Sequence, residues 1–178
     1  MKSSFIEAPH CIHILTFSCY HGYQFLNAER TRHWLARATD SACLEFNTRL
    51  IAYVFMPEHV HMMIQPRLAS MVTDRFLRRV KAPVARKAIQ HLVQSNPAWL
   101  ARISRKRGHR TERVFWQSGG GYDHCTYSDT EANRLIDYIH TNPVRKGLVV
   151  RPQDWIWSSA AWYVSGKPGP CVVHGIRS

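Results

Sequence analysis

The spacing of apolar and polar residues predicts a β-hairpin in the first half of the chain. Residues 49–56 are almost all apolar and too few for a typical helix, so they predict a buried central strand. Residues 59–65 predict the strand that follows, and Pro57-Glu58 between the two predicts a tight turn. An earlier strand is predicted over residues 12–20, which are rich in β-branched and aromatic side chains.

Two longer segments have apolar residues at the three-to-four spacing of amphipathic helices. The first runs over about 28–46. The second begins at about Met71 and contains Pro83. Because proline lacks a backbone donor and disfavours a helical residue before it, we expect a kink or a break into two helices near Ala82.

A third helix is predicted to begin at Ser128, where Ser-Asp-Thr-Glu forms a capping box. Tyr138 and Asn142 are one turn apart on a flank of its apolar stripe, and Arg134 lies toward the same side. Pro143 disfavours the α region for the residue before it, so we expect the helix to end at Asn142. The stripe itself falls on successive turns at Ala132, Leu135, Ile136 and Ile139.

The segment between the second and third helices is predicted to be irregular. Residues 101–113 predict a basic loop that is mobile until it binds a partner, and residues 118–121 predict a flexible glycine-rich turn. Residues 114–117 predict a short strand between them. The resulting order, strand-helix-strand-strand-helix-strand-helix, indicates an α+β fold.

Composition indicates one folded domain over residues 1–178. Hydrophobic residues make up 45% of the chain, and no apolar run is long enough to span a membrane. The N-terminus lacks the apolar stretch of a secretory signal. The five cysteines are odd in number and scattered, which argues against a disulfide framework and a zinc ribbon and favours the cytoplasm.

Charge indicates the class of partner. The chain has 24 Lys and Arg against 12 Asp and Glu, a net charge of +12. Such a field favours nucleic acid over a membrane surface, because no basic amphipathic helix with a large apolar face is evident. The alternative is a basic protein whose charge only keeps it in solution. Candidate DNA contacts lie on the second helix, in the basic loop and on the third helix: Arg78, Arg79, Lys81, Arg105, Lys106, Arg107, Arg110 and Arg134.

The predicted strand 59–65 carries a pair of candidate metal ligands. Side chains alternate along a strand, so His59 and His61 share one face. Together with the amide oxygen of Asn142 they would make a site with open positions for Mg²⁺ or Mn²⁺ and a substrate phosphate. A tyrosine hydroxyl beside such a metal, here Tyr138, is a candidate nucleophile.

These residues lie in motifs that resemble the single-tyrosine HUH transposases, and among them the REP-associated tyrosine transposases. The resemblance covers about residues 10–163, which implies a core there and leaves a C-terminal tail at about 164–178. The motifs that carry it are Pro57-Glu58-His59-Val60-His61, the stretch 137–149 from Asp137-Tyr138 through Asn142-Pro143 to Val149, Phe115-Trp116-Gln117, Asp123-His124, and Asp154-Trp155-Ile156-Trp157-Ser158-Ser159-Ala160.

The resemblance implies a ferredoxin-like antiparallel sheet with the histidine pair on a central strand and the tyrosine on a late helix across from it. It implies a nickase and strand transferase for single-stranded DNA with palindromic hairpins, acting as a monomer or a homodimer. Residue by residue, His59 and His61 match the metal-binding pair, Asn142 the position that completes it, and Tyr138 the nucleophile that forms a 5′-phosphotyrosine link.

Two alternatives stay open. One is a catalytically silent nucleic-acid-binding domain of the same fold. The other is a zinc protein that combines His59 and His61 with a cysteine such as Cys11 or Cys125, since thiolate ligands favour zinc. For the remaining candidates, His13, His124, His140, Trp155, Trp157 and Trp162, structural roles are the preferred interpretation; Glu58 is either a turn residue or a partner that orients a histidine.

Overall fold

The computed structural model describes residues 11–68, 73–119 and 121–176. It contains a four-stranded antiparallel sheet in the order β2-β3-β1-β6. The strands are β1 (Ile12–Ser18), β2 (Thr48–Phe55), β3 (His59–Pro66) and β6 (Tyr122–Thr126). With helices between β1 and β2 and between β3 and β6, this is the ferredoxin-like βαββαβ arrangement, which confirms the predicted α+β class.

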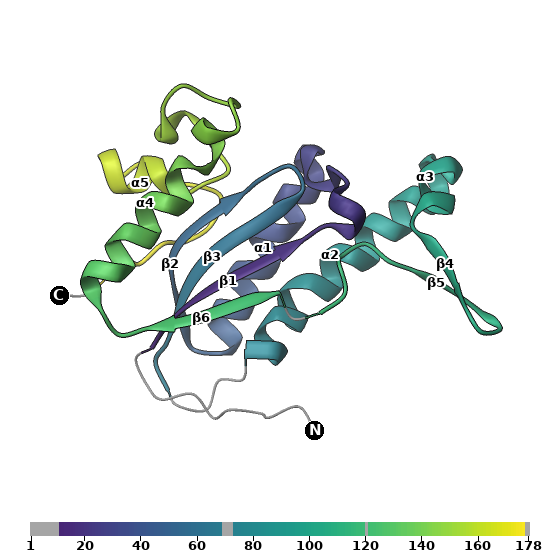
Figure 1. The fold of residues 1–178 in the computed structure, drawn as a ribbon, viewed down its shortest axis with the longest axis horizontal. Helices are drawn as coiled ribbons and strands as arrows, with labels where there is room; N and C mark the ends of the chain where they lie inside the picture. The colour runs from purple at the N-terminus through teal and green to yellow at the C-terminus, as the bar shows by residue number, and fades with distance from the viewer. Residues whose placement is uncertain (1–10, 69–72, 120, 177–178) are drawn as a thin grey trace.

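Helices cover both faces of the sheet (Figure 1). The helices α1 (Glu29–Glu45) and α2 (Thr73–Ser95) pack on one face, and α4 (Asp129–Arg145) packs on the other. Among the described residues, no helix is both long and apolar enough to cross a membrane.

The strand β3 separates two hydrophobic cores. Val60, Met62 and Ile64 belong to the core under α1 and α2. Met63 belongs to the core under α4, where it packs with residues such as Ile136. The two-residue alternation predicted for this strand is therefore confirmed, and the histidine side of β3 faces α4.

The prediction that β2 is a central strand is wrong, because β2 lies at the edge of the sheet. Its apolar character has another cause: the C-terminal segment covers its outer side. The Phe55 amide donates to the Trp157 carbonyl over 2.8 Å, and the His174 amide donates to the Leu50 carbonyl over 2.9 Å. The segment predicted as a C-terminal tail thus pairs with the sheet; it follows the helices η3 (Pro152–Asp154) and α5 (Ala160–Ser165).

The break predicted near Ala82 does not occur. The helix α2 runs without interruption past Pro83, because Val80 before the proline and Val84 after it are both buried in the same core. Packing on both sides outweighs the missing backbone bond. The predicted start at Met71 lies outside the described residues.

The basic segment is ordered as a hairpin, so the prediction of a loop over 101–113 is wrong. It follows the short helix α3 (Pro97–Arg102) and consists of β4 (Ser104–Arg107) and β5 (Arg110–Arg113). Gly108, at φ +61°, supplies the left-handed residue that its two-residue turn requires. The hairpin projects away from the sheet (Figure 1).

The strand predicted at 114–117 is also misplaced. Only an isolated bridge joins Trp116 to Cys19 there, and the fourth strand of the sheet is β6, which begins at Tyr122. The remaining short elements are the 3₁₀ helices η1 (Tyr20–Gly22) and η2 (Phe25–Asn27).

Gly121 enters β6 with its backbone against β1. Its φ is +84°, and a Cβ placed on it would lie 2.0 Å from the carbonyl oxygen of Thr16. We therefore expect Gly121→Ala to destabilise the protein by about 3 kcal/mol or more, since backbone strain adds to a clash with a strand. Gly119→Ala is the matched control: its φ is +103° but its Cβ would meet open space, so only the strain should remain. Urea denaturation of both variants measures the difference, and equal losses would contradict the close approach.

Candidate active site on the α4 face of the sheet

The histidine pair lies at the start of β3, with the two ring centroids 4.8 Å apart. Each ring is held at Nδ1 by a different partner. Nδ1 of His59 lies 3.1 Å from Oε1 of Glu58, and Nδ1 of His61 lies 2.7 Å from Oγ1 of Thr16 on β1. Such contacts orient an imidazole so that Nε2 is the nitrogen offered to a metal.

Burial keeps both imidazoles in their neutral form. It lowers the pKa of His61 to about 4, with a smaller contribution from the neighbouring His59. It also lowers the pKa of His59, although the Glu58 carboxylate opposes the shift. Neutral imidazole is the form that binds metal ions, so the pair is ready for one at neutral pH.

The helix α4 brings a tyrosine and an amide to this pair. The Tyr138 ring centroid lies 5.6 Å from that of His61, and the Tyr138 residue is 43% exposed. Asn142 is buried beneath it, where its Nδ2 donates to the Tyr138 carbonyl over 2.8 Å. That bond leaves Oδ1 of Asn142 as the atom that could coordinate an ion.

The prediction that α4 ends at Asn142 is wrong, because the helix continues through Pro143 to Arg145. Pro143 is buried and lies within the last turn, where the only intrahelical bond it removes is the one to the Ile139 carbonyl. The helix closes instead through the Lys146 amide, which donates to the Asn142 carbonyl over 3.1 Å. The extra turn matters because it adds two cations to the site.

A pocket of about 390 Å³ collects these groups. It is lined by His59, His61, Tyr138, Asn142, Arg145 and Lys146. The Arg145 guanidinium lies 5.2 Å from the Tyr138 ring centroid, and Nζ of Lys146 lies 3.7 Å from Oε1 of Glu58. The structure therefore brings the four predicted residues into one pocket, and it adds Arg145, Lys146 and the His61 partner Thr16, which the sequence prediction did not include. The helix C-terminus could have indicated the two cations, whereas Thr16 depends on the strand register.

Two contacts fix α4 relative to the sheet. Near its middle, Nε2 of His140 lies 2.7 Å from Oγ of Ser159, and that hydroxyl also accepts from the Tyr53 amide on β2 over 2.9 Å. At its start, the Ser128 hydroxyl accepts from the Glu131 amide, as the capping box predicts. The Glu131 carboxylate does not complete the box but accepts from the Thr126 hydroxyl of β6.

The site residues fit a divalent metal. Two neutral imidazoles and an amide oxygen are donors that Mn²⁺ and Mg²⁺ accept alongside phosphate and water oxygens. The donors come from β3 and α4, so an ion there would depend on both elements. His59, His61 and Asn142 are the residues that would hold it.

None of the predicted DNA contacts lines this pocket. Arg79 forms an ion pair with Glu45, and Arg105 forms one with Glu112 across the hairpin. Lys81 donates to the Gly119 carbonyl over 3.3 Å. The others are exposed: Arg78 on α2, Lys106, Arg107 and Arg110 on the hairpin, and Arg134 on α4.

The sequence argues against a disulfide framework, but Cys11 and Cys125 form one disulfide with their Cα atoms 5.9 Å apart. The two residues are far apart in the sequence, and only the pairing of β1 with β6 brings them together. The zinc alternative built on His59 is wrong. Ser18, and not Cys11, is the β1 residue opposite His59, and the cysteines lie roughly 23 Å away along the strand.

The tryptophans and secondary histidines have structural contacts. Trp157 is buried in the core under α1 and α2, and Trp155 packs against it, with its Nε1 donating to the Phe55 carbonyl. His124 lies 3.0 Å from Glu131.

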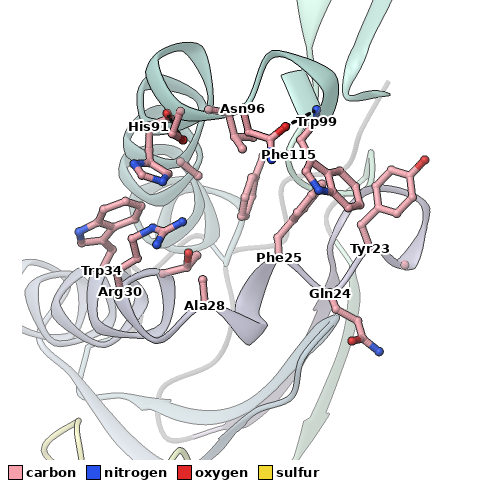
Figure 2. Close-up of a pocket in the computed structure, with 15 residues that line it drawn as sticks. Tyr23, Gln24, Phe25, Ala28, Arg30, Trp34, His91, Asn96, Trp99 and Phe115 are labelled. Carbon is pink, nitrogen blue, oxygen red and sulfur yellow. Dashed lines mark hydrogen bonds between the residues drawn. The ribbon is translucent and has the colours of Figure 1, made fainter. Parts of the chain in front are cut away.

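A larger cavity, of about 580 Å³, lies beside α1 and α2, the helices on the face of the sheet away from α4 (Figure 2). Figure 2 shows Trp34, Phe25, Trp99 and Phe115 around it, contributed by α1, α3 and the adjoining loops. His91 is the one imidazole among its lining residues, and no Cys, Asp or Glu accompanies it there. The smaller pocket therefore holds the candidate chemistry.

Residues 9–142 match the family model of IS200-like transposases. The chain therefore belongs to the IS200-like transposase family. No curated protein matches the chain.

Two solved structures are similar to this chain. A REP-associated tyrosine transposase bound to a REP hairpin has a TM-score of 0.68 and 16% identity, over 100% of this chain and 94% of that one. A second structure, from Deinococcus radiodurans R1 and named as a candidate transposase, has 18% identity and a TM-score of 0.45, over 78% of this chain and 95% of that one. The first likeness supports the fold.

The buried imidazole of His140 makes stability depend on pH. Burial lowers the pKa of His140 to about 4, below its ordinary value of 6.5. The unfolded chain therefore binds a proton that the folded chain does not, and stability falls as the pH drops from about 6.5 toward 4. Between pH 7 and 4.5 the free energy of unfolding should therefore fall for the parent protein by roughly 2 kcal/mol more than for His140→Gln, as measured by urea denaturation. The exposed His33→Gln serves as control, and an identical pH dependence in His140→Gln would contradict this account.

Proposed function

We propose that this chain is a metal-dependent endonuclease and strand transferase for single-stranded DNA, with Tyr138 as its nucleophile. The observation that carries the proposal is the placement of the Tyr138 ring 5.6 Å from that of His61, in one pocket with His59 and Asn142. A tyrosine half exposed beside two neutral imidazoles can reach a bound phosphate.

The chain's cations would bring the phosphodiester to the tyrosine. Arg145 and Lys146 lie on the pocket wall, and each carries a positive charge that attracts a phosphate oxygen. Arg145 also lies against the Tyr138 ring, so a phosphate bound to its guanidinium would be close to the phenol. A Mg²⁺ or Mn²⁺ ion held by His59, His61 and Asn142 would offset negative charge on the phosphoryl oxygens.

The Tyr138 oxygen then attacks phosphorus, and the bond between phosphorus and the 3′-oxygen of the preceding nucleotide breaks. The phenol loses its proton, and the departing 3′-oxygen gains one. The products are a 5′-phosphotyrosine link and a free 3′-hydroxyl. Because the link keeps the phosphodiester's energy, a 3′-hydroxyl can later attack it and rejoin strands.

We propose single-stranded DNA with palindromic hairpins as the partner. The structure with a TM-score of 0.68 is bound to a REP hairpin, and the present chain has a net charge of +12. The exposed arginines and lysine of the β4–β5 hairpin are the proposed backbone contacts, with Arg78 and Arg134. Three further points stay predictions: that the protein is located in the cytoplasm, that the chain is a single domain, and that it is a monomer or a homodimer.

Tyr138→Phe tests the chemistry directly. The variant lacks only the nucleophilic oxygen, so we expect it to bind labelled hairpin DNA but to form no covalent adduct in the presence of Mn²⁺. Denaturing gel electrophoresis detects the adduct. Tyr163→Phe is the control, since that tyrosine lies on α5 outside the pocket. Cleavage by the Tyr138→Phe variant would contradict the mechanism. If the parent protein binds the hairpin but forms no adduct, the result would favour a catalytically silent binding domain.

Thr16→Val tests whether His61 must be oriented for metal binding. Removal of the hydroxyl that holds Nδ1 should weaken Mn²⁺ affinity by about 10–100-fold, because a free ring loses its fixed orientation. The readout is the Mn²⁺ concentration that gives half-maximal adduct formation. Thr39→Val is the matched control, since that buried hydroxyl has no hydrogen-bond partner within the described chain. Equal Mn²⁺ requirements in the two variants would show that Thr16 has no positioning role.

A further inference from the structure

A second cluster of metal-binding side chains lies at the opposite end of β1 from the histidine pair. Cys11 and His13 are two residues apart, so they share one face of the sheet. Cys125 on β6 is directly opposite His13 in the strand register, which places its side chain on the same face. One ligand atom from each of the three residues lies within 4.8 Å of the others.

A carboxylate orients the imidazole of this cluster. Oδ1 of Asp123 lies 3.1 Å from Nδ1 of His13. Asp123 is two residues before Cys125, so it projects from the same face of β6. A carboxylate on one ring nitrogen fixes the tautomer that offers the other nitrogen to a metal, as at many zinc sites. The sheet therefore places Cys11 and His13, at the start of β1, beside Asp123 and Cys125 of β6.

The donor set suits zinc better than the hard ions expected at the histidine pair. Two sulfurs and one imidazole nitrogen are preferred zinc ligands, and bond lengths of about 2.3 and 2.0 Å place such atoms about 3.5–3.8 Å apart in a tetrahedron. Atoms already within 4.8 Å need only small side-chain rotations to reach that spacing. Cys11 and His13 are buried, while Cys125 is exposed, so an ion could enter from the side of β6.

The cluster is separate from the candidate active site. His13 projects from the same face of β1 as Leu15 and Phe17, which lie in the core under α1 and α2. Thr16, which holds His61, projects from the other face, toward α4. The two clusters therefore lie on opposite faces of the sheet, next to opposite ends of β1.

We propose that Cys11, His13 and Cys125 bind one Zn²⁺ ion when the Cys11–Cys125 disulfide is reduced. Reduction breaks the sulfur–sulfur bond and yields two thiols, while a phosphine reductant takes an oxygen from water and becomes the phosphine oxide. Zn²⁺ then binds as the two thiols release their protons. The disulfide and the ion exclude each other, because both need the same two sulfurs.

Either state ties the start of β1 to β6. The strand β6 is an edge strand that leads through two residues into α4, the helix that carries Tyr138. A cross-link there holds the strand that delivers the nucleophile. The zinc inference rests on its own residues and does not require the proposed transposase chemistry.

Cobalt provides the test, because a Co²⁺–thiolate bond gives a charge-transfer band in the near ultraviolet and the His59 site has no thiolate. We expect the full chain, reduced with a phosphine and kept free of oxygen, to bind Co²⁺ with this band, and Zn²⁺ to abolish it. Cys125→Ser is the main variant, because its side chain is exposed and its replacement leaves no core cavity. It should lose the band, and Asp123→Asn should weaken Co²⁺ binding by about 10–100-fold.

Two controls separate this site from the rest of the molecule. Cys43→Ser removes a free cysteine of α1 and should keep the band, as should His61→Ala, which removes the other site. A reduced parent protein without the band would overturn the proposal and leave a disulfide only. So would a band that persists in Cys125→Ser. If the parent protein gives the cobalt–thiolate band but does not cleave hairpin DNA, that result would count against the proposed function alone.

Discussion

The geometry of the candidate active site depends on the two-residue period of β3. The strand lies between two cores, and a shift of one residue would move Val60 and Met62 toward α4 and the histidines into the opposite core. That exchange would bury two imidazoles in an apolar layer, at a cost of several kcal/mol. Burial of β3 therefore fixes the face on which His59 and His61 appear, and the Thr16 contact across β1 fixes how one ring lies.

The sequence predicted those parts of the fold that depend on a local period. The alternation along β3 and the apolar stripe of α4 each follow from one segment, so both faces were identified correctly, with the structure bringing Tyr138 and Asn142 to the histidines. The family motif supplied the pairing of the two segments. Residues that join the site through pairing of distant strands had no local signal. Thr16 is one, since its contact with His61 exists only once β1 and β3 are in register.

The mistaken elements have a common cause, which is packing by segments far away in the sequence. The strand β2 resembles a central strand because the C-terminal segment shields its edge, and that segment begins about a hundred residues later. Pro83 and Pro143 break no helix because buried neighbours hold the turns on either side. The disulfide of Cys11 is likewise invisible until β6 lies beside β1. In each case local preference is a weak prior that tertiary contacts override.

The donor set of the pocket has a consequence for the order of binding. Hard divalent ions prefer carboxylate ligands, and the side chains that line the pocket offer only neutral donors and two cations. The carboxylate of Glu58, which is not among the lining residues, contacts His59 and Lys146. Glu58 offsets part of the charge of Lys146, so a divalent ion would meet mainly the positive charge of Arg145, and the phosphate of DNA is the group that would neutralise it. Metal and DNA would each lower the electrostatic cost of binding the other, so the proposed function implies that their affinities are coupled reciprocally. On this proposal the pocket suits a ternary complex, in which the ion would be held weakly until the strand binds.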